Sequence, residues 1–167
     1  NDETYNNEYG ANMKLSLLIA SVLTLSLVAC SKAPDIQLND GSEIDWQGSQ
    51  GNTVVVNYFA EWCAPCLREL PELNEFHHDV VSNDSQLTLV GISFDPMNNQ
   101  QINALAEKHG IDFPLALSQP APQLPFDKPK MLPATYIVGP DGKVTGPLLG
   151  EQTQATLNKA VAEARSE

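Results

Sequence analysis

The sequence predicts an α/β protein in which strands and helices alternate and pack in three layers. Two largely apolar runs, residues 53–59 and 87–94, have the length and continuity of strands that are buried on both faces. Each run is followed by apolar residues that recur every three or four positions, which is the pattern of one helical face. A hairpin and a last helix complete the order, which is that of a three-layer α/β arrangement. With 167 residues, 42% of them apolar, the chain is long enough for one domain with a substantial core.

The first element in chain order is a predicted export signal. Lys14 follows Met13 and precedes the uncharged run of residues 15–29, which is short for a membrane span. The segment Leu27-Val28-Ala29-Cys30 closely resembles a bacterial lipobox. In signals of that kind the peptide is cut before the cysteine, which becomes the lipidated first residue of the mature protein. We therefore expect cleavage before Cys30 and lipidation of it, with an uncut signal-anchor helix as the main alternative.

The predicted lipid indicates where the protein is located, and the charge of the chain limits its partners. A lipidated Cys30 would hold the protein on the periplasmic side of a bacterial membrane, in a compartment where disulfides persist. Ser31 follows it, and under the Gram-negative sorting rule the lack of aspartate there favours the outer membrane. The formal net charge of -12 argues against nucleic acid as a partner, because phosphates would be repelled and no cluster of lysine or arginine relieves the repulsion.

After the signal, a polar linker leads into a hairpin and then into the first core strand. Residues 31–52 are polar with scattered apolar residues, and Asn39-Asp40-Gly41 is a turn sequence. An N-terminal hairpin is therefore expected in this region. The first core strand follows it over residues 53–59.

The motif Trp62-Cys63-Ala64-Pro65-Cys66 follows the first core strand directly. A strand that ends in such a turn puts Cys63 at the first residue of a helix and Cys66 one turn further in, so the two thiols are close enough to form a disulfide. Unpaired N–H groups at the helix start stabilise a sulfur anion, which predicts a lowered pKa for Cys63 and makes it both attacker and leaving group. Cys66, expected to be covered, would resolve the mixed disulfide.

The other use of a CxxC pair is one half of a zinc site, which needs two further cysteine or histidine ligands. The chain has no second CxxC pair. Its histidines, His77, His78 and His109, are not in a tight ligand pattern. The sequence therefore favours a redox-active disulfide, with no metal and no cofactor.

The rest of the chain continues the alternation of helix and strand. A helix is expected to reach about residue 81, and the second helix runs from a cap at Asn98 or Asn99 to Gly110, a residue suited to a helix end. A short strand is expected over residues 113–117.

An irregular loop and a hairpin precede the last helix. Residues 118–130 contain four prolines and are expected to form the loop. Residues 134–138 and 143–149 are predicted strands, joined by the turn Gly139-Pro140-Asp141-Gly142. Thr153 is expected to cap the last helix.

With two cysteines at the end of the first core strand, this order resembles the thioredoxin fold. More narrowly, it resembles the TlpA/ResA-like group of membrane-attached extracytoplasmic thiol-disulfide oxidoreductases. The likeness covers about residues 33–164 and is carried by residues 33–35, 56–66, 67–71, 132–138 and 140–144. The helix from Asn98 fits that group's insertion between core elements. We therefore expect a thioredoxin fold with α/β/α layers, an N-terminal hairpin and a central helical insertion.

The chain is therefore predicted to consist of four parts. They are residues 1–12 as upstream sequence or sequence added in cloning, 13–29 as a lipoprotein signal peptide, 30–52 as the lipidated cysteine, linker and hairpin, and 53–167 as the thioredoxin-like domain.

The resemblance implies roles for residues around the cysteines. Pro133 matches the cis-proline loop, which packs against the disulfide and offers backbone groups to a substrate strand. Leu132, just before it, would face the sulfur atoms. Glu69 matches an acidic residue that the group uses near its cysteines, and partial removal from water should raise its pKa, so that it would pass protons to and from Cys66.

Two more residues complete the expected site. Asn57 stands where cytoplasmic thioredoxins have a buried aspartate. An asparagine cannot transfer a proton as that aspartate does, so Glu69 is expected to do so. Trp62 is expected to shield the disulfide and to contact the substrate.

The implied activity is that of a membrane-anchored protein-disulfide reductase or thiol-disulfide oxidoreductase. Cys63 would attack a protein disulfide, and Cys66 would resolve the mixed disulfide. The resemblance also implies a membrane electron donor of the DsbD type, and apocytochrome c and copper-site proteins are among the compatible clients.

Two alternatives remain open at the level of sequence. A copper-binding chaperone of the SCO type shares the fold and a cysteine pair, but such proteins use CxxxC with a distal histidine. A peroxiredoxin-like peroxidase has a proline and a threonine leading into its cysteine, where this chain has Glu61-Trp62.

Overall fold

A computed structural model of the chain describes residues 33–47 and 49–166. The unit described below is Pro34–Glu167. The predicted signal peptide, Cys30 and Ser31 lie outside the described residues. Among the helices of the described part, none combines the length and the apolar character needed to cross a bilayer.

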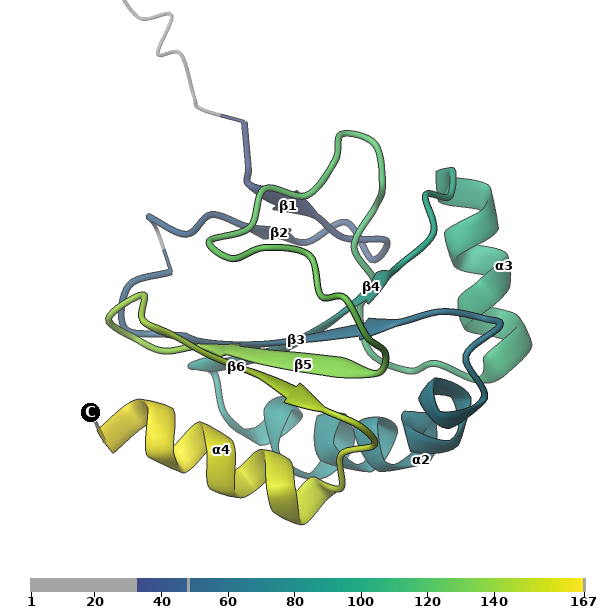
Figure 1. The fold of residues 1–167 in the computed structure, drawn as a ribbon. Coiled ribbons are helices and arrows are strands. Elements are labelled where there is room, and N and C mark those ends of the chain that lie inside the picture. The colour runs from purple at the N-terminus through teal and green to yellow at the C-terminus, as the bar shows by residue number, and fades with distance from the viewer. Residues whose placement is uncertain (1–32, 48, 167) are drawn as a thin grey trace, which may run out of the picture. The chain divides into compact units, whose positions relative to one another are not determined.

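A four-stranded sheet lies at the centre of this unit, with the strands in the order β4-β3-β5-β6 (Figure 1). β3 runs parallel to β4 and antiparallel to β5, which in turn pairs antiparallel with β6. Every residue of β3 and β5 is buried, because these central strands are covered on both faces. The two apolar runs are both strands, as predicted, and the structure makes them neighbours in the sheet. The bounds are β3 (Thr53–Phe59), β4 (Leu87–Ser93), β5 (Ala134–Val138) and β6 (Val144–Leu149).

Two helices cover one face of the sheet: α2 (Ala64–Asp79) and α4 (Gln154–Ser166) (Figure 1). A 3₁₀ turn, η1 (Val81–Asn83), follows α2. The Thr153 hydroxyl accepts a hydrogen bond from the N–H of Thr156 at 3.3 Å, so Thr153 caps α4 as expected. The core on this face includes Val55, Phe59, Leu70, Leu73, Phe76, Ile137, Leu157 and Val161.

The opposite face is covered mainly by non-helical chain. The antiparallel strands β1 (Ile36–Gln37) and β2 (Glu43–Ile44) form the predicted N-terminal hairpin, and the loop of residues 118–130 lies over the same face (Figure 1). Successive residues of a strand point to opposite faces, so the alternate residues of β3 enter this second core. Its members include Ile36, Leu38, Ile44, Val54, Val56, Tyr58, Ile92 and Tyr136.

A third helix of the described residues, α3 (Asn99–His109), follows β4 and is the expected central insertion. Asn98 and Gln101 form a reciprocal capping box at its start, each side chain accepting from the backbone N–H of the other at 2.9 Å. Gly110 ends the helix in the left-handed conformation, with φ 60°. With this helix in place, the elements follow the order expected for the thioredoxin fold.

Residues 113–117 do not form the short strand that the sequence predicted. Leu115 makes an isolated parallel bridge to Gly91 in β4. The N–H of Ala116 donates to the Gly91 carbonyl, whereas the N–H of Leu117 donates to the carbonyl of Gln37 in β1. Because the segment divides its hydrogen bonds between β4 and the hairpin, no continuous ladder forms.

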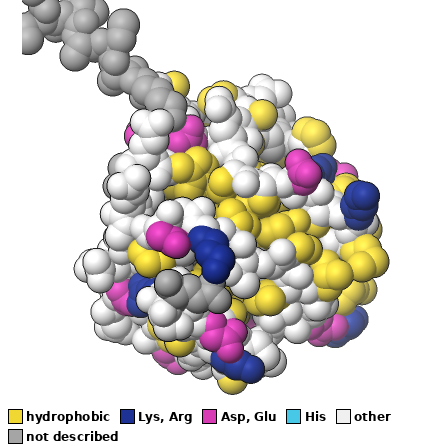
Figure 2. Space-filling view, turned by 60° about the vertical axis from the view of Figure 1, so that its left-hand side comes forward, with side chains coloured by type: hydrophobic (Ala, Val, Ile, Leu, Met, Phe, Trp, Pro, Cys, Tyr) yellow, Lys and Arg dark blue, Asp and Glu magenta, His cyan; other side chains and the backbone are white. Residues whose placement is uncertain are grey.

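Hydrophobic side chains gather in the middle of the face shown in Figure 2, and acidic and basic side chains lie around them, several of them next to a side chain of opposite charge. The charge on this face is therefore dispersed, and the apolar surface is the continuous feature.

Candidate active site

Cys63 and Cys66 are joined in a disulfide at the start of α2, with their Cα atoms 5.2 Å apart. The sequence placed Cys63 at the first helical residue, but it is the N-cap, because its backbone is extended (φ -90°, ψ 93°). From that position its sulfur accepts a hydrogen bond from the N–H of Cys66 at 3.3 Å. The sulfur thus lies at the positive end of α2, where negative charge is stabilised.

The two cysteines differ in access to solvent. Cys63 is 5% exposed to solvent and lines a groove, whereas Cys66 is completely buried. A sulfur atom arriving from solution can therefore reach Cys63 and not Cys66. The geometry therefore separates an accessible sulfur from a covered one, and Cys66 is covered as expected.

A groove of about 520 Å³ opens beside Cys63. Three large hydrophobic side chains are exposed in the described part of the chain, and two of them line this groove: Trp62, 66% exposed, and Met131, 60% exposed. Exposed apolar groups next to a reactive sulfur are suited to dock a polypeptide. The full lining is Trp62, Cys63, Ala64, Pro65, Phe94, Lys130, Met131 and Leu132.

Trp62 is fixed on the rim of the groove by two contacts from the chain that follows β4. Its Nε1 donates to Asp95 Oδ2 at 2.7 Å. Its ring meets the Phe94 ring edge to face, with the centroids 6.2 Å apart. These contacts hold the indole beside Cys63 while leaving most of its surface in solvent.

The peptide bond between Leu132 and Pro133 is cis, as the resemblance implies. Pro133 is buried, and its carbonyl accepts a hydrogen bond from the N–H of Gly150 at 3.0 Å, which ties this loop to the end of β6. Leu132 is half-buried and lines the groove. The CxxC turn and the cis-proline loop, far apart in the sequence, therefore form two sides of one groove.

Glu69 is a buried carboxyl on α2, with 1% of its surface exposed. Its Oε1 accepts from Asn57 Nδ2 at 2.9 Å, and its Oε2 accepts from the N–H of Gln152 at 3.0 Å. Burial outweighs these two hydrogen bonds and raises the pKa of Glu69 to about 7. Three residues after Cys66, the carboxyl lies on the same side of the helix and changes its protonation near neutral pH.

Asn57 holds this carboxyl without adding a second charge to the site. Its Nδ2 donates to Glu69 and, at 3.1 Å, to Thr135 Oγ1. Its Oδ1 is buried and has no hydrogen-bond partner. After a half-turn of its amide, Asn57 can offer that oxygen to a protonated carboxyl, so the pair accommodates both states of Glu69.

Sequence reasoning missed three residues that shape the site: Phe94, Asp95 and Met131. Phe94 ends the predicted second strand and Asp95 directly follows it. In a parallel pair the carboxyl end of that strand lies beside the carboxyl end of the CxxC strand, and this adjacency could have identified both residues. Met131 precedes Leu132-Pro133 and could have been found from the cis-proline loop.

Two of the histidines contact acidic side chains and not the cysteines. His109 Nε2 lies 3.3 Å from Glu61 Oε1, which also forms an ion pair with Lys108, and hydrogen bonds from these two residues lower the pKa of Glu61. His78 pairs with Asp112 at 3.2 Å. In the part of the chain that the structure describes, no three histidine, cysteine or acidic side chains are grouped so as to hold a metal ion.

The comparisons with known proteins agree with this site. Thiol-disulfide oxidoreductase ResA of Geobacillus thermodenitrificans is 28% identical to the chain over 131 residues, which is 77% of this chain and 74% of the relative. ResA of Bacillus subtilis is 25% identical over 130 residues, covering 77% and 71%.

Solved structures show the same fold. A thioredoxin-family thiol:disulfide interchange protein from Chlorobium tepidum matches with a TM-score of 0.60 and 24% identity, over 77% of this chain and 90% of that one. StoA from Bacillus subtilis matches with a TM-score of 0.61 and 18% identity, over 74% and 92%.

A thioredoxin fold with a CxxC disulfide at the start of its first core helix defines a thiol-disulfide oxidoreductase. The model of the AhpC/TSA family matches residues 30–146, more than half of the chain. The chain belongs to the AhpC/TSA family.

Proposed function

We propose that this oxidoreductase is a lipid-anchored, extracytoplasmic protein-disulfide reductase. The observation that carries the proposal is the asymmetry of the cysteine pair. Cys63 meets the groove at the positive end of α2, while Cys66 is buried one turn before a carboxyl whose pKa is raised to about 7. That arrangement suits an attacking thiolate and a protected resolving thiol whose proton has a nearby acceptor.

The proposed reaction transfers two electrons from the reduced enzyme to a client disulfide. The Cys63 thiolate attacks one client sulfur, the client S–S bond breaks, and the other client sulfur leaves as a thiolate that takes up a proton. Cys66 then gives its proton to Glu69 and attacks the Cys63 sulfur. This step forms the enzyme disulfide and releases the second client thiolate.

The groove would position the client for this exchange. Trp62 and Leu132 offer apolar contacts on either side of Cys63, and the cis-proline loop at Pro133 would present backbone groups to the client strand. Pairing of an extended client segment with that loop would fix the angle at which its sulfur approaches.

The anchor and location rest on the sequence before the described residues. Lipidation of Cys30, after removal of residues 13–29, would tether the domain to the periplasmic side of a membrane, and Ser31 favours the outer one. In cells fed radiolabelled palmitate, the wild-type chain should incorporate label and a Cys30→Ala chain should not. Equal labelling of the two chains would contradict the lipid anchor.

Each turnover oxidises the enzyme, so a reductant must restore its dithiol. A membrane electron donor of the DsbD type is the proposed source, and apocytochrome c and copper-site proteins are the proposed clients. Clients of these classes share a cysteine pair that must be reduced before a haem or a metal is attached.

A trapping experiment tests the proposed function directly. In a Cys66→Ala protein the mixed disulfide at Cys63 cannot be resolved, so client proteins should accumulate as covalent adducts that mass spectrometry identifies. The double variant Cys63→Ala, Cys66→Ala is the control and should trap nothing. Adducts rich in CxxCH proteins would indicate cytochrome assembly, a broad set of secreted proteins would indicate general reduction, and equal capture by the double variant would contradict the mechanism.

A further inference from the structure

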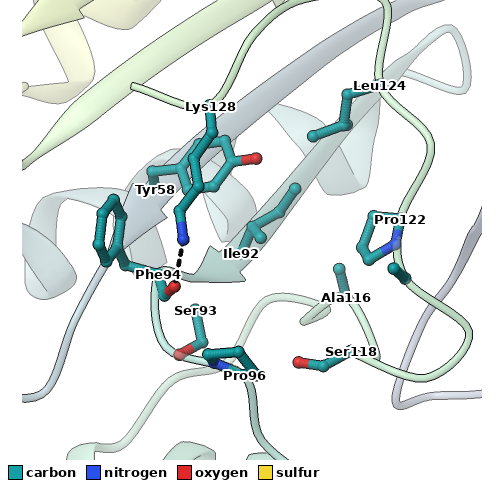
Figure 3. Close-up of a pocket in the computed structure, with 11 residues that line it drawn as sticks. Tyr58, Ile92, Ser93, Phe94, Pro96, Ala116, Ser118, Pro122, Leu124 and Lys128 are labelled. Atoms are coloured by element: carbon teal, nitrogen blue, oxygen red, sulfur yellow. Dashed lines mark hydrogen bonds between the residues drawn. The ribbon is translucent and has the colours of Figure 1, made fainter. Parts of the chain in front are cut away.

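A second hollow, of about 220 Å³, shares the Phe94 side chain with the disulfide groove (Figure 3). Its floor comes from the ends of β3 and β4, through Tyr58 and Ile92. The loop of residues 118–130 forms the far wall, through Pro122 and Leu124. The hollow therefore lies where the face opposite α2 and α4 meets the active-site end of the sheet.

Phe94 is held between the two hollows by contacts on both sides. Trp62 meets its ring edge to face on the groove side. Lys128 extends across it, with Nζ 3.7 Å from the ring centroid and donating to the Phe94 carbonyl at 2.7 Å (Figure 3). The Phe94 ring separates the groove from the hollow and is held in place, so the two sites lie at a fixed position relative to each other.

The lining of the hollow suits an uncharged apolar group. The ammonium of Lys128 is turned onto the Phe94 carbonyl. Ser93 and Ser118 are also engaged, since the Ser93 hydroxyl donates to the Asp95 carbonyl and the Ser118 hydroxyl accepts from the N–H of Met97. Burial raises the pKa of Tyr58 to about 12, so its hydroxyl stays neutral.

The size of the hollow limits what can occupy it. At about 220 Å³ it lies below the range of roughly 300–1,000 Å³ that holds cofactors and drug-sized ligands. It is suited to one aromatic or long aliphatic side chain. Because it adjoins the groove at Cys63 through Phe94, a polypeptide lying in the groove can reach it without leaving the surface.

We infer that this hollow, the Phe94 pocket, is a specificity subsite that binds an apolar side chain of the client polypeptide near its reacting cysteine. The inference rests on the proposed reductase function and adds a substrate preference to it. Clients with an aromatic or long aliphatic residue close to the disulfide would be reduced faster than clients without one. The disulfide of glutathione is too small to gain from the pocket.

The test uses peptides whose single cysteine is joined to glutathione by a disulfide. In one series a phenylalanine is placed in turn at each position on either side of the cysteine, and in the matched series an alanine takes its place. Single-turnover rates with the reduced protein are each divided by the rate on glutathione disulfide. We expect the best phenylalanine peptide to react about tenfold faster than its alanine counterpart, the factor that corresponds to partial burial of one aromatic side chain. A ratio near one at every position overturns the subsite.

Matched substitutions locate the effect. Ala121 is exposed and lines the pocket, so an Ala121→Phe ring should fill the mouth and bring the ratio close to one. Ala162 is exposed on α4, on the other side of the sheet, and Ala162→Phe should leave the ratio unchanged. A full preference in the Ala121→Phe protein, or its loss in the Ala162→Phe protein, contradicts the assignment.

A binding measurement separates the pocket from the proposed function. A cysteine-free phenylalanine peptide should shift the methyl NMR signals of Ile92 and Ala116 in the wild type and not in the Ala121→Phe protein. If the protein reduces none of the disulfides, the reductase proposal fails and the methyl shifts alone decide whether the pocket binds. Unshifted methyl signals in the wild type overturn the pocket.

Discussion

A Cys63→Ser protein is expected to have no measurable activity in the reduction of insulin disulfides. The serine hydroxyl is not ionised near neutral pH and cannot form a mixed disulfide, so both sulfur exchanges are lost. Cys66 cannot replace it, because its side chain is completely buried. The measurement is insulin turbidity with dithiothreitol as reductant, at equal protein concentrations.

The result is informative only if the Cys63→Ser protein and its reference are equally stable. The variant lacks the disulfide, so the proper reference is the wild type in its reduced form, with thermal unfolding of both followed by circular dichroism. A Cys66→Ser protein is the second control, since it keeps the accessible sulfur and should form a mixed disulfide once without turning over. Insulin reduction by the Cys63→Ser protein at the wild-type rate would rule out the assigned chemistry.

The second large effect is expected at Glu69. A Glu69→Gln protein cannot accept the Cys66 proton, and loss of a general base in a positioned site slows the reaction by about 100-fold or more. The amide fits the same space: it can accept from the N–H of Gln152, and after a half-turn of the Asn57 amide, which now turns its Nδ2 to Glu69, it can donate to the Asn57 Oδ1. The rate of mixed-disulfide resolution, measured by rapid mixing between pH 5 and 9, should lose the ionisation near pH 7 that the wild type shows.

The same carboxyl makes folding stability depend on pH. Burial raises the pKa of Glu69 from 4.5 to about 7, so between these values the folded protein retains a proton that the unfolded chain has released. The wild type is therefore most stable, with respect to this group, below pH 4.5, and it loses about 3 kcal/mol as the pH rises to 7. Urea unfolding should show this loss in the wild type and not in the Glu69→Gln protein.

Glu75 provides a matched control for both measurements. It lies on α2 as Glu69 does, but its side chain is exposed. A Glu75→Gln protein should keep the wild-type rate and the wild-type pH dependence of stability. If Glu69→Gln and Glu75→Gln behave alike, the buried carboxyl has no special part in proton transfer.

Local sequence determined the elements and the reactive pair. The continuous apolar runs of β3 and β4 and the turn at residues 139–142 each specify structure through contacts between near neighbours, so they were predicted without tertiary information. The same holds for the cap of α3, which the sequence placed at Asn98 or Asn99 and which is Asn98. The CxxC spacing likewise fixed the disulfide, because residues three apart at a helix start are adjacent. The strand predicted over residues 113–117 was wrong, because the backbone of this segment divides its hydrogen bonds between β4 and the N-terminal hairpin.

Tertiary structure alone decided the surroundings of the disulfide. Glu69 is buried because the backbone of Gln152 and the amide of Asn57 meet it from other elements, and only that burial sets its pKa near 7. The groove and the Phe94 pocket arise where loops from distant parts of the chain converge on the ends of β3 and β4. Sequence patterns report local periodicity, whereas desolvation and cavity shape depend on which distant segments pack together, and that is settled only when the chain folds.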